Sequence, residues 1–89
     1  MTNMKQMLAE LKAAEEATNK VDKQWDAEPE NEALAAEWTA AYKREMDAYF
    51  ALREEIGRVT GGKISPKDAG LMIRAKRAEL EALIDRMAG

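Results

Sequence analysis

The clearest structural signal in the sequence is the run TGGKISP, residues 60–66, which interrupts a helical pattern of apolar residues. Gly61 or Gly62 can take the left-handed backbone conformation that closes a helix. Ser65 can accept a hydrogen bond from the first turn of a following helix, and Pro66 suits the first position of that helix. The run therefore predicts the end of one helix and the start of the next.

A second interruption is the run DAEPEN, residues 26–31. Pro29 lacks an amide donor and disfavours helical geometry at the residue before it. The two interruptions divide the chain into three long predicted helices, at about residues 2–26, 30–59 and 66–87. Because the connections are short, consecutive helices should be antiparallel neighbours. We expect residues 1–89 to form one all-α domain, as an elongated antiparallel bundle or as a helical hairpin plus a third helix.

Apolar residues recur every three or four positions in each predicted helix, as in helices that pack along one another. The stripe of the second helix is Leu34, Trp38, Tyr42, Met46 or Glu45, Tyr49, Leu52, Ile56 and Val59. Lys76 interrupts the apolar stripe of the third helix. The core should be thin, because only 14 of the 89 residues are Leu, Ile, Val or Phe, whereas 17 are Ala. No cysteine is present to supply a disulfide, so we expect the chain to form a homodimer. The residues expected to form the core seam or the dimer seam are Met7, Leu11, Leu52, Ile56, Leu80 and Leu83.

Side chains for common catalytic chemistry are scarce in this sequence. It has no histidine, no cysteine and a single serine, Ser65, which is better explained as a helix cap. The Gly61-Gly62-Lys63 run matches a phosphate-binding loop only in part, because Ile64 stands where that motif needs Ser or Thr. The acids around residue 29 lack the central glycine of a common calcium loop. We therefore expect no enzyme activity, no catalytic residue, no metal site and no cofactor.

The sequence contains no run of 18 or more apolar residues, so we expect no membrane-spanning segment and no membrane partner. Its first residues lack the apolar centre of a signal peptide. The absence of cysteine fits a reducing compartment. These features predict a cytoplasmic protein.

Charge is unevenly distributed along the chain. Residues 1–57 hold 7 basic and 13 acidic side chains, whereas residues 58–89 hold 7 basic and 4 acidic ones. Five acids and no base lie between residues 26 and 37, and a tryptophan flanks this stretch on each side. At helical spacing the aromatic residues fit a core role, but exposed Trp and Tyr are frequent hot spots of protein interfaces. The candidate partner-binding residues are Trp25, Asp26, Glu28, Glu30, Glu32, Glu37 and Trp38.

Three interpretations of the charge pattern remain open. In the first, the acidic and basic zones are simply solvated faces, or they attract each other within the bundle or across a dimer. Alternatively, the acidic zone docks a basic protein, since complementary charge speeds encounter and selects partners. In the third interpretation the basic zone contacts nucleic-acid phosphates. The candidate phosphate-contacting residues are Lys63, Lys67, Arg74 and Arg77.

The leading hypothesis is a non-enzymatic helical interaction module that binds or occludes a partner protein with a basic surface. Small inhibitors encoded by phages and mobile elements, anti-CRISPR proteins included, often act by covering a working surface. The likeness here is one of size and charge, not of sequence. One alternative is a small nucleic-acid-binding regulator that uses the basic turn and the third helix. The other is a self-assembling structural subunit or assembly chaperone.

Overall fold

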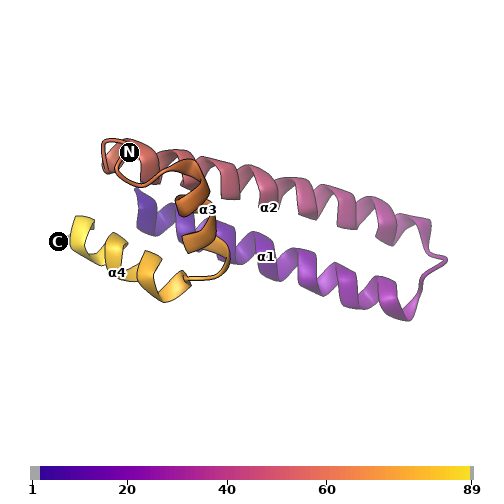
Figure 1. Cartoon of the computed structure of the whole chain (residues 1–89). Coiled ribbons are helices and arrows are strands. Elements are labelled where there is room, and N and C mark those ends of the chain that lie inside the picture. Colours follow the sequence, from indigo (N-terminus) through magenta and orange to yellow (C-terminus); the bar gives the residue numbers. More distant parts are fainter. Residues whose placement is uncertain (1–2, 89) are drawn as a thin grey trace.

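The computed structural model describes residues 3–88 and contains four helices and no strand within that range. They are α1 (Met4–Ala27), α2 (Glu32–Val59), α3 (Pro66–Arg74) and α4 (Arg77–Ala88). The first two form a long antiparallel hairpin, and α3 and α4 lie against one end of it (Figure 1). The molecule measures 47 × 24 × 22 Å. The prediction of an all-α fold is confirmed.

The prediction of a single third helix over residues 66–87 is wrong. The helix ends at Arg74, and a new helix begins at Arg77, with Ala75 and Lys76 between them. α3 packs on α2, whereas α4 packs on α1. The break falls beside Lys76, where the apolar stripe is interrupted and no large apolar side chain would hold a continuous helix on α2. It allows the C-terminal segment to cover both helices of the hairpin, which one straight helix would not do.

The side chain of Arg77 closes the end of α3. Its Nε donates a hydrogen bond to the carbonyl oxygen of Ile73 at 2.8 Å. The backbone amides of Ala75 and Lys76 both donate to the carbonyl oxygen of Leu71, at 2.8 and 3.2 Å. Since the last carbonyls of a helix have no partner within the helix, these contacts stabilise the break between α3 and α4.

The connection between α2 and α3 has the geometry that its sequence predicts. Gly61 and Gly62 adopt positive φ angles of 62° and 84°. The hydroxyl oxygen of Ser65 accepts a hydrogen bond from the amide of Asp68 at 3.2 Å, and Pro66 lies in the first turn of α3. The predicted glycine turn and serine cap are therefore confirmed.

The buried core lies at the end of the hairpin that α3 and α4 cover. Its members are Met4, Leu8, Leu11, Tyr49, Leu52, Ile56, Ala69, Ile73, Leu80, Leu83 and Ile84. Five of the six predicted seam residues belong to it, and the sixth, Met7, is half-buried against it. These six side chains therefore pack within one chain, so a homodimer would have to use another surface.

The other half of the hairpin stands clear of α3 and α4 (Figure 1). Between residues 12 and 48 the only buried side chains are those of Ala14, Thr18 and Leu34. The hydroxyl of Thr18 donates to the carbonyl oxygen of Ala14 at 3.0 Å, so its burial leaves no polar group unpaired. We call the projecting part, residues 21–42, the hairpin end. Two helices alone cover little of each other's surface, so much of the hairpin end faces solvent.

Candidate functional site

Three aromatic side chains form a strip along the hairpin end. The ring centres of Trp38 and Tyr42 lie 5.0 Å apart with the rings nearly parallel, at 7°. The Trp25 ring, from α1, lies 6.1 Å from that of Trp38 and is tilted by 48°. Both tryptophans are half-buried, and Tyr42 is 41% exposed. We call these three residues the aromatic strip; they pack on one another and still present apolar surface to solvent.

Sequence reasoning placed Tyr42 in the apolar stripe of the second predicted helix and missed it as a site residue. The structure places it on the surface instead, because neither α3 nor α4 reaches the hairpin end. Its spacing of four residues from Trp38 is the signal that pointed to the stacked pair, since residues four apart are neighbours on a helix.

Five exposed carboxylates surround the turn of the hairpin. Asp26 lies in the last turn of α1, and Glu28 is its C-terminal cap residue. The other three are Glu30 in the turn and Glu32 and Glu37 in α2. Within residues 3–88 none of the five forms an ion pair. We call this set of five the acidic tip.

Backbone hydrogen bonds hold the turn that carries the acidic tip. The amide of Glu28 donates to the carbonyl oxygens of Gln24 and Trp25, at 3.0 and 3.1 Å. The amide of Asn31 donates to the carbonyl oxygen of Glu28 at 3.0 Å. The side-chain oxygen of Asn31 then accepts from the amides that start α2. Trp25 Nε1 also donates to the carbonyl oxygen of Pro29, at 3.2 Å, which ties the strip to the turn.

The helix dipole does not explain the acidic tip as a whole. An acid in the first turn of a helix is favourable, and this accounts for Glu32 in α2. Asp26 and Glu28 instead lie at the C-terminal end of α1, where the dipole is negative and cations are favoured. The last turn of α1 contains no basic residue. Two of the five acids therefore lie where the fold itself disfavours them.

The four candidate phosphate-contacting residues do not share one environment. Lys63 and Lys67 are exposed, in the α2–α3 connection and the first turn of α3. Arg77 is half-buried, and its two terminal nitrogens bind both carboxylate oxygens of Glu15, at 3.2 and 3.1 Å. The guanidinium carbon of Arg74 lies 4.6 Å from the centre of the Tyr49 ring. Of the four, only Lys63 and Lys67 form neither an ion pair nor a cation–π contact within residues 3–88.

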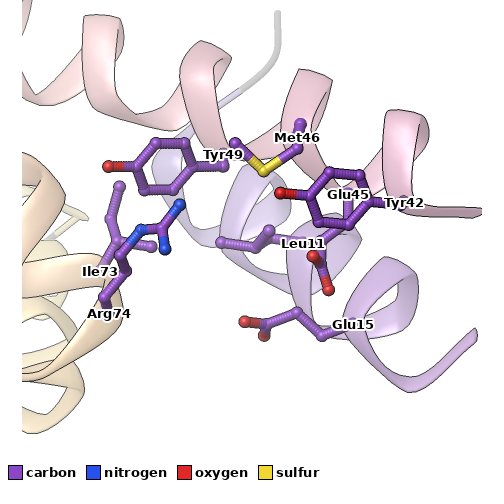
Figure 2. A pocket seen from close by; sticks show the side chains of 8 residues that line it. All are labelled: Leu11, Glu15, Tyr42, Glu45, Met46, Tyr49, Ile73 and Arg74. Atoms are coloured by element: carbon purple, nitrogen blue, oxygen red, sulfur yellow. The ribbon is translucent and has the colours of Figure 1, made fainter. Parts of the chain in front are cut away.

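A small cavity opens between α1, α2 and α3 (Figure 2). Its volume is about 120 Å³. It begins at Tyr42 and ends against Ile73 and Arg74, with two carboxylates on one side. The lining residues are Leu11, Glu15, Tyr42, Glu45, Met46, Tyr49, Ile73 and Arg74.

Glu45 lies in this cavity with a perturbed acidity. Burial raises the pKa of its carboxyl above the ordinary value of 4.5, the Glu15 carboxylate raises it further, and Arg74 opposes both. Its spacing put Glu45 at a stripe position, beside Met46. A charged side chain at an apolar stripe position indicates a possible binding site. Glu45 and Glu15 are nevertheless not among the site residues predicted from the sequence.

Residues 3–88 contain no cluster of three acidic, histidine or cysteine side chains placed to hold a metal. No helix among them has the length and apolar character needed to cross a membrane. Comparisons with protein families, with curated proteins and with solved structures find no match to this chain in any of the three.

Proposed function

We propose that this chain is a non-enzymatic interaction protein of the cytoplasm, and that its hairpin end binds a partner protein with a basic surface. The observation that supports this most is the combination of the aromatic strip and the acidic tip on a part of the hairpin that the core does not use. Half-exposed Trp and Tyr side chains supply apolar area and polar edges, as interface hot spots do. A surrounding set of unpaired carboxylates favours a basic partner.

The placement of Asp26 and Glu28 supports the same proposal. Acids at the negative end of α1 lower the stability of the fold, whereas a basic partner would neutralise them. A role in binding accounts for acids at these two positions. A projecting helical hairpin also suits occlusion, in which the hairpin covers a surface that the partner needs for its own work. This is how small phage and mobile-element inhibitors, anti-CRISPR proteins among them, often act.

Self-assembly through the hairpin end is less favourable. A second copy would bring another five carboxylates against the first five, and like charges across an interface are repulsive. The alternatives of a homodimer or a structural subunit thus require a surface elsewhere on the chain. Light scattering at several concentrations tests this: a mass of about 10 kDa throughout would rule out self-assembly as the function.

The nucleic-acid alternative has less support than the protein-binding one. Arg77 is paired with Glu15, and its Nε closes α3, so it is not free to bind phosphate. Lys63, Lys67 and the exposed Arg74 remain, and three phosphate contacts give only weak, salt-sensitive binding. A binding assay with duplex DNA and with RNA at about 50 mM salt decides the matter, because the electrostatic contribution is large there.

The main test is recovery of proteins from soluble lysate on the immobilised chain, quantified by mass spectrometry. The tip variant carries Glu28→Lys, Glu30→Lys and Glu32→Lys. The control variant carries Glu10→Lys, Glu54→Lys and Asp85→Lys, which changes the net charge equally at exposed acids outside the hairpin end. We expect a basic protein that wild type and control recover equally and that the tip variant loses.

Two results would contradict the proposal. One is equal recovery of the partner by wild type and the tip variant, since binding would then not depend on the acidic tip. The other is equal loss by the tip and control variants, since overall charge would then explain recovery. Trp38→Ala provides an independent check, because the loss of a hot-spot tryptophan should weaken binding by about 2 kcal/mol or more without any change of charge.

A further inference from the structure

The cavity of Figure 2 adjoins the aromatic strip, because Tyr42 belongs to both. A shallow polar groove also shares Glu15, Glu45 and Arg74 with the cavity, so the cavity is reached from solvent. A protein seated on the strip therefore lies beside the Tyr42 wall of the cavity. We propose that this cavity is a socket for an arginine side chain of the partner, an inference that rests on the proposed function above.

The charges of the cavity favour a cation. Glu45 forms no ion pair within residues 3–88, and Figure 2 shows its carboxylate on the same side of the cavity as that of Glu15. The Glu15 carboxylate is already bound by Arg77, which leaves Glu45 as the acceptor for an incoming group. Burial and the neighbouring Glu15 raise the pKa of Glu45 by more than Arg74 lowers it, so the charged form of Glu45 is only partly compensated. A bound cation would complete the compensation.

The shape and the walls of the cavity favour a guanidinium over an ammonium. An apolar cavity of about 150 Å³ accepts benzene, and the guanidinium group is planar and smaller than that ring. The cavity here, about 120 Å³, offers the Tyr42 ring with Leu11 and Met46 for the flat faces and the side-chain stem. Guanidinium groups stack on aromatic rings and bind carboxylates with two parallel hydrogen bonds, which a lysine cannot do.

Arg74 already shows that this site accepts a guanidinium against an aromatic ring, since it lies over Tyr49. Its charge also opposes a second cation at the same place. Removing that charge while keeping the first three carbons of the side chain and a polar end, as Arg74→Gln does, should therefore strengthen binding. This gives the proposal a variant with improved binding, which general damage to the fold would not produce.

The probe for the socket is N-acetyl-L-arginine N-methylamide, titrated into the full chain and followed by the backbone amide signals in nuclear magnetic resonance spectra. The matched ligand is the citrulline derivative, which has nearly the same shape and no charge. The variants are Glu45→Gln and Arg74→Gln. The control is Glu54→Gln, at an exposed acid of the same helix that does not line the cavity.

We expect saturable shifts at the amides of the lining residues and a dissociation constant in the millimolar range. Citrulline and Glu45→Gln should each weaken binding about fivefold to tenfold, as expected for one charge-assisted contact at a partly exposed site. Arg74→Gln should tighten it, and Glu54→Gln should leave it unchanged. Three results would contradict the proposed socket. They are equal binding of the two ligands, equal binding by Glu45→Gln and wild type, and shifts spread over all exposed acids.

Failure of the socket and failure of the proposed function give different results. The tip variant with Lys at positions 28, 30 and 32 does not alter the cavity lining, so it should bind the arginine probe as wild type does. If the tip variant loses the partner while Glu45→Gln recovers it fully, the hairpin end binds the partner and the socket idea is wrong. If Glu45→Gln weakens probe binding but the tip variant recovers the partner as wild type does, the cavity binds arginine and the proposed function is wrong.

Discussion

The ring of Tyr49 in α2 lies directly against Gly70 in α3. A Cβ atom at position 70 would lie 2.5 Å from the Tyr49 hydroxyl oxygen and 3.7 Å from the ring carbon that bears it. Tyr49 and Gly70 are both buried, and the contact brings α3 close to the hairpin at the wall of the cavity. The absence of a side chain at position 70 therefore sets how closely α3 can approach α2.

Gly70→Ala should lower the free energy of unfolding, because the Cβ and the tyrosine hydroxyl cannot both keep their places. The expected loss is about 1–3 kcal/mol from overpacking, reduced by about 1 kcal/mol because Ala favours a helix more than Gly does. Gly57→Ala is the matched control. Its Cβ would meet nothing within 4 Å, so it should stabilise α2 by about 0.5–1 kcal/mol. Urea denaturation of both variants measures the two changes.

Tyr49→Phe tests the cause of the Gly70→Ala loss. Without the hydroxyl, the nearest ring atom to a Cβ at position 70 lies at an ordinary contact distance. In the Tyr49→Phe background, Gly70→Ala should then be neutral or stabilising, so the double-mutant cycle should show a coupling of about 1 kcal/mol or more. Strict additivity would mean that the loss has another origin.

Asp26→Lys should raise stability and reduce partner binding at once. It replaces an acid with a cation in the last turn of α1, which the helix dipole favours by about 0.3–1 kcal/mol, and it places that cation four residues after Asp22. Glu10→Lys, in the first half of the same helix, makes the same charge change and should alter stability by less than about 0.5 kcal/mol. Denaturation curves and partner recovery are measured on the same preparations. A more stable Asp26→Lys chain that keeps its partner would show that this acid is not used for binding.

The turn chemistry and the helical class were readable from the sequence because they depend on local rules. Gly61, Gly62, Ser65 and Pro66 each have a strong positional preference, and the structure uses all four as predicted. The break between α3 and α4 was not readable in the same way. Ala75 and Lys76 are good helix formers, so local propensity favours one continuous helix there. Packing on two different helices of the hairpin is the tertiary effect that overrides it.

The candidate site was readable only in part, for a similar reason. The acids of the turn and the two tryptophans are close in sequence, so a pattern finds them. The cavity is assembled from α1, α2 and α3, and the contact between Arg77 and Glu15 joins residues 62 positions apart. Spacing along one helix does not reveal which side chains of another helix lie opposite. Tyr42 and Glu45 therefore looked like stripe positions until the helices were placed.

Glu45→Gln should stabilise the fold at about pH 7, and the advantage should disappear on acidification. In the folded chain, burial raises the pKa of Glu45 above its ordinary value of 4.5, so the ionised form opposes folding at neutral pH. As pH falls through the folded-state pKa toward 4.5, wild type takes up this proton in the folded state first and gains stability. The Glu45→Gln chain has no carboxylate at this position to take up a proton. The difference in stability between the two chains therefore disappears below the unfolded-state pKa. Thermal unfolding of both chains across this range checks the sign; a constant gap would contradict it.

Arg77→Gln should loosen α4 while leaving the hairpin end intact. The change removes the hydrogen bond to the Ile73 carbonyl and both contacts to Glu15. Because the pair is about one-third exposed, the expected loss is about 1–2 kcal/mol. Arg77→Lys should recover little of it, since an ammonium cannot reproduce the guanidinium's bonds to both carboxylate oxygens and the helix end.

Hydrogen exchange locates the effect of Arg77→Gln. The amides of Leu80, Leu83 and Ile84 should lose protection, because α4 packs on α1 beside the altered pair. Amides of the hairpin end should exchange as in wild type, and recovery of a basic partner should be unchanged. Loss of the partner together with unaltered protection at the hairpin end would assign Arg77 a direct part in binding. That result would also revive the basic zone as an interaction surface, since it would show that this guanidinium is available despite its contact with Glu15.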